Sequence, residues 1–143
     1  MLTLNNGGRF LLIELPEEYY PNYTERVLFE LQLGGVIPIL AHPERNKILL
    51  NNPLKLAGLV QRGVLLQITS GSLVGVFGKK VKAATENMVV SKMVHFMASD
   101  LHGPDKRLGA IGKARYKLVD LIGQREAKKI IKENPLLLLR GNG

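Results

Sequence analysis

Cysteine and tryptophan are both absent from this chain of 143 residues. Without cysteine, the fold cannot depend on disulfide bonds, and thiolate metal sites and cysteine nucleophiles are excluded. No apolar run approaches the roughly 18 residues that a membrane-spanning helix needs. The polar, glycine-containing residues 1–9 do not resemble a secretory signal. We therefore expect a cytoplasmic protein with no membrane insertion.

The composition also excludes a disordered chain. Hydrophobic residues make up 45% and charged residues 22%, close to the averages of globular proteins. The length fits one domain by the usual range of roughly 100–200 residues. Lys and Arg number 20 and Asp and Glu 12, a net charge of +8, and such a chain attracts phosphorylated substrates, nucleic acids or acidic membranes.

Much of the positive charge lies in the C-terminal third of the chain. These basic residues alternate with acidic ones, which is typical of a solvated helix face. No aromatic residues are interleaved as in single-strand binders, and no RNA-binding motif is present. We therefore expect no nucleic-acid partner. The basic residues are Lys113, Arg115, Lys117, Arg125, Lys128, Lys129 and Lys132.

Short apolar runs alternate with segments of helical periodicity along the chain. Apolar strands that alternate with helices indicate a parallel sheet. The sequence therefore predicts an α/β fold, either a doubly wound sheet or part of a β/α barrel. Four β-α units amount to about half of a barrel. The expected strands are 10–13, 36–41, 64–69 and 94–99, and the expected helices are 23–33, 53–62, 80–93, 108–122 and a short charged helix at 125–133, ended by Asn134-Pro135.

Ionisable side chains stand at the carboxyl ends of three of these strands. Because parallel strands end at one edge, and that edge holds the active site in such folds, we expect these side chains to converge. Imidazoles with carboxylates suit Zn, Mn or Fe, and carboxylate-rich sets favour Mn or Mg. The sequence therefore predicts a divalent metal site. Its candidate ligands are Glu14, His42, Asp100 and His102.

Each candidate also has an ordinary structural explanation. Glu14 could cap a helix or be solvated, His42 before a proline could belong to a turn, and Asp100 could form an Asx turn. Their equivalent positions in successive β-α units favour a shared site over these separate explanations.

Two arginines follow the candidate ligands closely. Arg45 and Arg107 present planar guanidinium groups that bind phosphate in a bidentate manner, so they suggest a phosphate ester as substrate. The alternative is a surface pair with Glu44 or Asp105.

Two further features carry less information. The Gly71-Ser72 pair could offer backbone N–H groups to an anion, although such pairs are common in loops. His95 stands at the start of the fourth expected strand, away from the candidate ligands, and we expect it to have a structural role.

Four motifs together resemble one known family, and the resemblance runs from about Arg9 to Ile122. That family is the bacterial metal-dependent protein-tyrosine phosphatases of capsule and exopolysaccharide gene clusters, which belong to the PHP (polymerase and histidinol phosphatase) superfamily. The motifs are Leu12-Ile13-Glu14-Leu15-Pro16, Ile39-Leu40-Ala41-His42-Pro43-Glu44-Arg45-Asn46, Leu66-Gln67-Ile68-Thr69-Ser70-Gly71-Ser72 and Ala98-Ser99-Asp100-Leu101-His102.

The resemblance implies a distorted β/α barrel that holds two or three divalent ions, typically Mn, at the strand ends. It implies hydrolysis of phosphotyrosine on a protein, namely a partner bacterial tyrosine kinase that controls polysaccharide export. The metal ligands of the family match Glu14, His42, Asp100 and His102, and its phosphate-binding arginines match Arg45 and Arg107.

The chain departs from the family pattern at its beginning. The family starts with an Asp-x-His-x-His segment, and no histidine precedes His42 here. The resemblance therefore implies that residues 1–143 form the C-terminal part of a PHP-type phosphatase domain whose N-terminal barrel half is absent. We expect weak or no activity from this part alone, and its unpaired strand edges could lead to a homo-oligomer. The alternatives are a small-molecule phosphoesterase of the superfamily and a non-catalytic truncated binding module.

Overall fold

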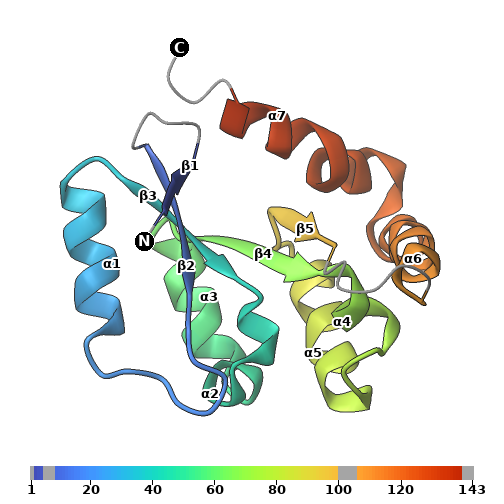
Figure 1. Ribbon diagram of the computed structural model, residues 1–143, viewed down its shortest axis with the longest axis horizontal. Helices are drawn as coiled ribbons and strands as arrows, with labels where there is room; N and C mark the ends of the chain where they lie inside the picture. Colours follow the sequence, from blue (N-terminus) through green and yellow to red (C-terminus); the bar gives the residue numbers. More distant parts are fainter. Residues whose placement is uncertain (1, 5–8, 100–105, 140–143) are drawn as a thin grey trace.

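The computed structural model describes residues 2–4, 9–99 and 106–139, with side chains at 9–99 and 111–139. Strands and helices alternate through most of this chain (Figure 1). The strands are β1 (Leu2–Leu4), β2 (Phe10–Glu14), β3 (Ile37–Ala41), β4 (Leu65–Thr69) and β5 (Phe96–Ala98). The helices are α1 (Thr24–Leu33), η1 (Pro43–Arg45), α2 (Lys47–Leu50), α3 (Pro53–Gln61), α4 (Ser70–Val74), α5 (Lys79–Val90), α6 (Lys106–Lys128), η2 (Lys129–Glu133) and α7 (Asn134–Leu139).

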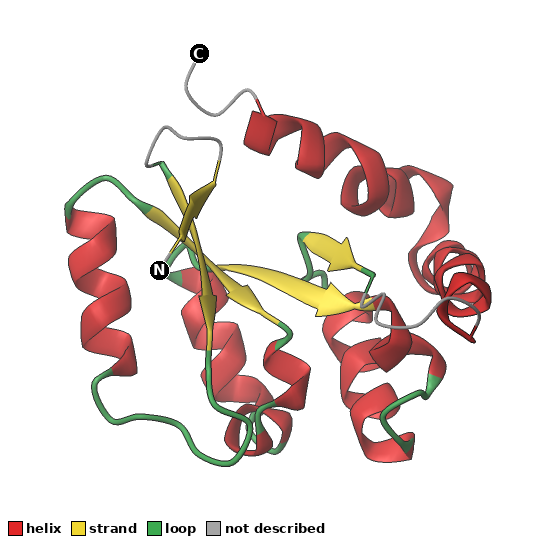
Figure 2. Ribbon diagram, viewed as in Figure 1, coloured by secondary structure: helices red, strands yellow, loops and turns green. Residues whose placement is uncertain are grey.

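The strands form one sheet in the order β1-β2-β3-β4-β5, drawn in yellow in Figure 2. β2, β3, β4 and β5 are parallel neighbours in chain order. A doubly wound sheet reverses its strand order at a switch point, whereas a β/α barrel adds its strands in sequence. The observed order confirms the predicted α/β fold and favours the barrel type of the two alternatives.

β1 departs from the prediction of an entirely parallel sheet. This strand pairs antiparallel with β2, with Leu2 opposite Leu12 and Leu4 opposite Phe10. A strand of three residues is too short to show an alternating pattern in the sequence, so no strand was expected there.

The sheet has a separate apolar cluster on each face. On one face, Leu40, Leu66 and Ile68 pack against helices α1, α3, α4, α5 and α6 in the main core. On the other face, Phe10, Ile39 and Phe96 form a smaller cluster that Leu138 of α7 partly covers. Because successive strand residues point to opposite faces, Glu14 and Gln67, which line the cleft described below, also lie on this second face.

Pro38 is the second residue of strand β3. It lies opposite Leu11 of β2, while pairing between β3 and β4 begins only at Ile39. Its missing N–H therefore removes no hydrogen bond from the β3–β4 ladder.

The helices after β3 and β4 are more numerous than the sequence predicted. α3 and α5 agree with expectation within a few residues, and Pro53 occupies the first turn of α3 as predicted. α2 and α4 were not expected, because they have four and five residues. Helices this short give no periodicity, and the glycines around α4 favour a loop.

The C-terminal region confirms one expectation and corrects another. α6 is interrupted at Gly123, whose φ of 86° and ψ of 165° are not helical, so the two expected helical segments exist. The predicted break at Asn134-Pro135 is wrong, because Asn134 keeps helical angles and begins α7. The helical backbone runs on from the π-helical residues of η2 into α7, and Asn134 Nδ2 donates to the His95 carbonyl oxygen at 2.8 Å.

Basic residues are spread over this C-terminal region, in agreement with the expectation of a solvated face. Lys117 pairs with Glu86 at 3.1 Å and Lys129 with Glu126 at 3.2 Å.

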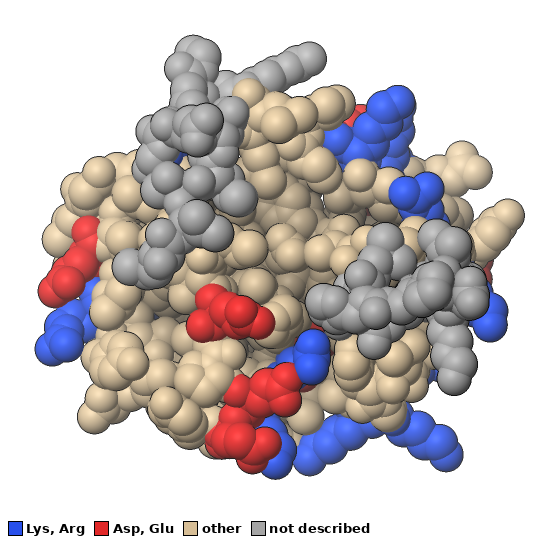
Figure 3. Space-filling model, viewed as in Figure 1, with Lys and Arg blue, Asp and Glu red and all other residues tan. Residues whose placement is uncertain are grey.

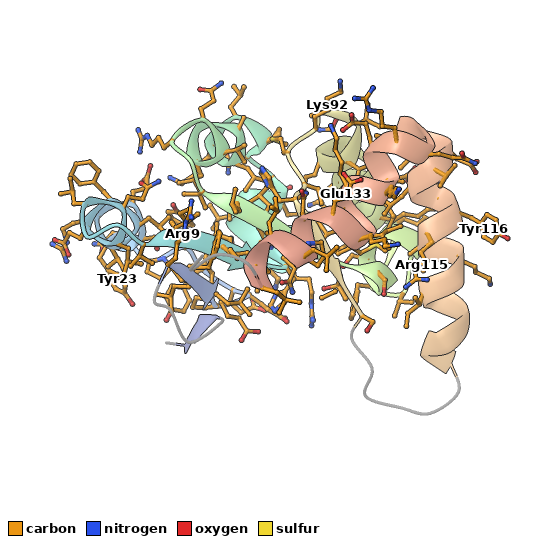
Figure 4. All side chains as sticks on the ribbon, turned by 90° about the horizontal axis from the view of Figure 1, so that it is seen from above. Arg9, Tyr23, Lys92, Arg115, Tyr116 and Glu133 are labelled. Atoms are coloured by element: carbon orange, nitrogen blue, oxygen red, sulfur yellow. The ribbon has the colours of Figure 1, made fainter. Side chains whose placement is uncertain are left out.

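The outer side of α6 faces away from the sheet, and Figure 4 shows Tyr116 projecting from it in that direction. Among the described residues, no helix combines the length and the apolarity that crossing a membrane requires.

Candidate active site

A cleft of about 1050 Å³ opens at the carboxyl ends of the parallel strands. Its apolar walls include residues of α1 and of the segment between α4 and α5. Acidic and basic atoms lie next to each other at the lower middle of the face seen in Figure 3. The polar residues that line the cleft include Glu14, His42, Arg45, Gln67, Thr69 and Ser99.

Glu14 and His42 meet in this cleft, as the sequence predicted. Glu14 is the last residue of β2 and His42 follows β3. The His42 Nε2 atom lies 2.7 Å from Glu14 Oε1. The Glu14 side chain is 70% exposed and that of His42 21% exposed, so both groups remain accessible from the cleft.

His42 has an unusual backbone conformation. Its φ of 35° and ψ of 57° place it in the left-handed region, although a residue before proline normally prefers extended angles. The His42 N–H donates to the Gln67 carbonyl oxygen of β4, which holds the turn against the neighbouring strand. Such strain persists only where surrounding contacts impose it, and it is common at functional sites.

Arg45 lies beside this pair and is held by two other segments. Its Nη2 donates to Glu17 Oε1 at 2.7 Å, and its guanidinium Cζ lies 4.4 Å from the centre of the Phe77 ring. The expected alternative partner of Arg45 was Glu44, and the structure shows Glu17 in that place.

Glu44 instead points into the protein interior. Only 1% of its surface is exposed, and its Oε2 accepts a hydrogen bond from the Thr69 N–H at 3.0 Å. Burial raises the pKa of the Glu44 carboxyl, and the Thr69 hydrogen bond partly opposes that rise. Glu44 thus ties the turn after β3 to the end of β4.

Asn46 fastens the segment after β3 to the segment after β2. Its Oδ1 accepts from Ile48 N and Leu49 N, both at 3.0 Å, and so caps α2. Its Nδ2 donates to the carbonyl oxygens of Pro16 and Tyr19 at 2.7 and 3.0 Å. These four hydrogen bonds fix the two segments that carry Glu14, Glu17, His42 and Arg45.

The two weaker candidates have structural explanations. Gly71 and Ser72 are buried in α4, which is too short to act as an anion site at its N-terminus. The His95 Nδ1 accepts a hydrogen bond from Leu66 N at 3.2 Å, in agreement with the structural part that the sequence predicted for it.

Three predicted site residues are not placed by the structure. Asp100 and His102 lie outside the described residues. Arg107 lies in the first turn of α6, where only the backbone is described. Their convergence with Glu14 and His42 stays a prediction.

The residues that are described fit a divalent metal ion in part. An imidazole nitrogen and a carboxylate oxygen are donors that such ions accept, and both face the cleft. Among residues 9–99 and 111–139, no group of three or more acidic, histidine or cysteine side chains is suited to hold a metal. Further ligands would have to come from elsewhere, and Asp100 and His102 are the candidates.

Sequence reasoning did not identify Glu17, Asn46 or Phe77 as parts of the site. Glu17 precedes Arg45 by the same 28 residues that separate Glu14 from His42, and this shared interval could have indicated the pairing. Nothing in the sequence indicates that Phe77 stacks on Arg45, because their contact depends on how separate loops pack.

Comparison with known proteins matches nearly the whole chain to one family. Residues 1–140 match the family described as "Capsular polysaccharide synthesis, CpsB/CapC". The chain is 43% identical to tyrosine-protein phosphatase YwqE of Bacillus subtilis over 140 residues, which cover 98% of this chain and 54% of that protein. It is 39% identical to the putative tyrosine-protein phosphatase CapC of Staphylococcus aureus, over 95% of this chain and 51% of that protein.

A solved structure shows the same fold. It belongs to the crystal structures of YwqE from Bacillus subtilis and CpsB from Streptococcus pneumoniae, which are described as unique metal-dependent tyrosine phosphatases. The superposition has a TM-score of 0.85 and 42% sequence identity, and it covers 94% of this chain and 54% of the other. The chain therefore spans about half the length of the relatives that it matches.

Proposed function

The chain belongs to the CpsB/CapC family of capsular polysaccharide synthesis, and on that basis we propose that it forms part of a metal-dependent protein-tyrosine phosphatase. The observation that carries this proposal is the cleft in which Glu14 and His42 meet beside Arg45. Relatives named tyrosine-protein phosphatases support the substrate class.

Glu14 and His42 would contribute an oxygen and a nitrogen ligand to the metal, with Asp100 and His102 as the remaining candidates. When bound, a divalent ion, for which we propose Mn²⁺, supplies Lewis-acid polarisation of the phosphoryl group. The left-handed turn at His42 directs its imidazole toward Glu14, with Nε2 2.7 Å from Glu14 Oε1.

Arg45 would bind the phosphate of the substrate. A guanidinium donates in a planar fork that matches two phosphate oxygens, and it stabilises the charge that develops on them in the transition state. Arg107 is the second candidate for this part. The walls from Tyr23 and Val27 would exclude water from the phosphate and contact the aromatic ring.

The substrate that we propose is phosphotyrosine on a partner bacterial tyrosine kinase. We also propose that residues 1–143 represent the C-terminal part of the phosphatase domain, with impaired activity when alone. The match to only about half of each relative's length supports the view that this chain is a part of such a domain. The cytoplasmic location and the homo-oligomer stay predictions.

The decisive experiment measures hydrolysis of a phosphotyrosine peptide by this chain with excess Mn²⁺ and with a chelator. We expect slow turnover that the chelator abolishes and that His42→Ala lowers by at least about 100-fold. His95→Asn is the matched control, because His95 lies outside the cleft lining.

The same assay separates the alternatives. Faster hydrolysis of small alkyl phosphates than of the peptide would favour a small-molecule phosphoesterase. An unchanged rate in His42→Ala would overturn the ligand assignment. No turnover by the unaltered chain would mean that this part needs the rest of the domain for activity, and metal-independent binding of a partner would then favour the non-catalytic binding module.

A further inference from the structure

Phe77 lies between α4 and α5, and its side chain forms part of the cleft wall. The guanidinium of Arg45 lies over its ring, with Cζ 4.4 Å from the ring centre. That distance is well inside the roughly 6 Å over which a cation is attracted to the face of an aromatic ring. Phe77 thus restricts where the flexible Arg45 side chain can lie.

The Phe77 ring is itself seated against the backbone of α4. A Cβ atom at Gly71 would lie only 3.3 Å from Phe77 Cε2 and 3.3 Å from Val76 Cβ. The Gly71 carbonyl oxygen also accepts the Val76 N–H at 2.9 Å. The absence of a side chain at Gly71 therefore allows the ring to occupy its place under Arg45.

A second contact holds Arg45 from the other segment. Glu17 accepts a hydrogen bond from Arg45 Nη2 at 2.7 Å, and the Glu17 carbonyl oxygen accepts the Lys47 N–H at 2.9 Å. Glu17 is half exposed, so this contact alone would restrain Arg45 weakly. The Phe77 ring, which is seated against α4, therefore adds a second restraint from another segment.

We propose that Phe77, seated on Gly71, is a positioning residue that directs the guanidinium of Arg45 into the cleft to receive the phosphate. This inference rests on the proposed function, in which Arg45 binds phosphate. An arginine that is already ordered loses less conformational entropy when it binds its ligand. Without the Phe77 ring, the cleft would keep the positive charge of Arg45, but the guanidinium would no longer be held in one orientation.

The first readout is the NMR resonance of the Arg45 Nε–H group. In the unaltered chain we expect a ring-current shift, because the guanidinium lies over the aromatic face. Phe77→Leu should remove this shift, Phe77→Tyr should retain it, and Gly71→Ala should reduce it by displacing the ring. Val76→Ala is the matched control, since this exposed neighbour does not line the cleft.

The second readout is the affinity for phosphotyrosine in the presence of Mg²⁺, which is not paramagnetic. Ordering one flexible side chain before it binds corresponds to about twofold to tenfold in affinity. We expect that loss in Phe77→Leu and Gly71→Ala, and affinity within about twofold of the unaltered chain in Phe77→Tyr and Val76→Ala.

Arg45→Ala separates failure of this inference from failure of the proposed function. If Arg45→Ala binds phosphotyrosine as well as the unaltered chain, the assignment of Arg45 is wrong and both proposals fall. If Arg45→Ala weakens binding while Phe77→Leu changes neither the resonance nor the affinity, only the positioning inference is wrong. Should Phe77→Leu unfold, as circular dichroism would reveal, Gly71→Ala and Phe77→Tyr decide the question by the same two readouts.

Discussion

His95 is a partly buried histidine whose environment favours the neutral imidazole. Its Nδ1 accepts a hydrogen bond from Leu66 N, and its carbonyl oxygen accepts one from Asn134 Nδ2. Burial lowers the pKa of His95 from its ordinary value of 6.5. Protonation of Nδ1 would also remove the acceptor for Leu66.

This shift of the pKa predicts how stability depends on pH. Because the unfolded chain takes up the proton at higher pH than the folded chain, this contribution to stability is complete above pH 6.5 and falls as the pH drops through the lowered pKa. His95→Asn keeps an acceptor for Leu66 and removes the titration. We therefore expect its melting temperature to fall less than that of the unaltered chain between neutral and mildly acidic pH.

Thermal unfolding followed by circular dichroism across that pH range measures the difference between the two proteins. The other two histidines, His42 and His102, are present in both and contribute equally. Equal falls in melting temperature would show that His95 is not the titrating group.

The segments after β2 and β3 depend on each other for their conformation. Asn46 caps α2 through Oδ1 and holds the β2–α1 segment through Nδ2. The same residue, which is only 3% exposed, thus both caps α2 and binds the β2–α1 segment. The position of Glu17 therefore depends on the Asn46 side chain, which binds the carbonyl oxygens of Pro16 and Tyr19 on either side of it.

Two substitutions separate these functions of Asn46. Asn46→Asp keeps the cap but cannot donate to Pro16 or Tyr19, and we expect a loss of about 1–3 kcal/mol in the free energy of unfolding. Asn46→Ala loses the cap as well, which adds roughly 1 kcal/mol. Urea denaturation of both variants measures these values, and an aspartate variant as stable as the unaltered chain would show that the Nδ2 bonds contribute nothing net.

Metal binding should stabilise the molecule as a whole if the cleft holds an ion. A ligand that binds only the folded chain at a hundred times its dissociation constant adds about 2.7 kcal/mol. For a chain of this length, that corresponds to a rise of roughly 5–10 °C in melting temperature.

We expect this rise when Mn²⁺ is added to the unaltered chain and its disappearance in His42→Ala. Differential scanning fluorimetry with Mn²⁺ and with a chelator measures it, and His95→Asn serves as control. A rise of equal size in His42→Ala would mean that the ion binds elsewhere.

The sheet of the described chain also has two ends, β1 and β5. In relatives about twice as long, further chain is available to cover such edges. In the predicted homo-oligomer, a second copy of the chain would cover them, and this stays a prediction.

Local patterns in the sequence were enough to predict the strands β2, β3, β4 and β5 and the helices α1, α3 and α5. Apolar runs bounded by glycine or proline, and apolar residues at helical spacing, depend on near neighbours only. The same patterns placed Glu14 and His42 at strand ends, and parallel strands end at a common edge, so their meeting followed from topology.

Other features depended on contacts between distant segments. Asn134-Pro135 reads as a helix break, yet the chain stays helical there, where Asn134 binds the His95 carbonyl oxygen. The pairing of Arg45 with Glu17 and Phe77, and the burial of Glu44, arise where three loops pack together. Such contacts follow from the tertiary arrangement, because each partner's own neighbours in the sequence are compatible with several conformations.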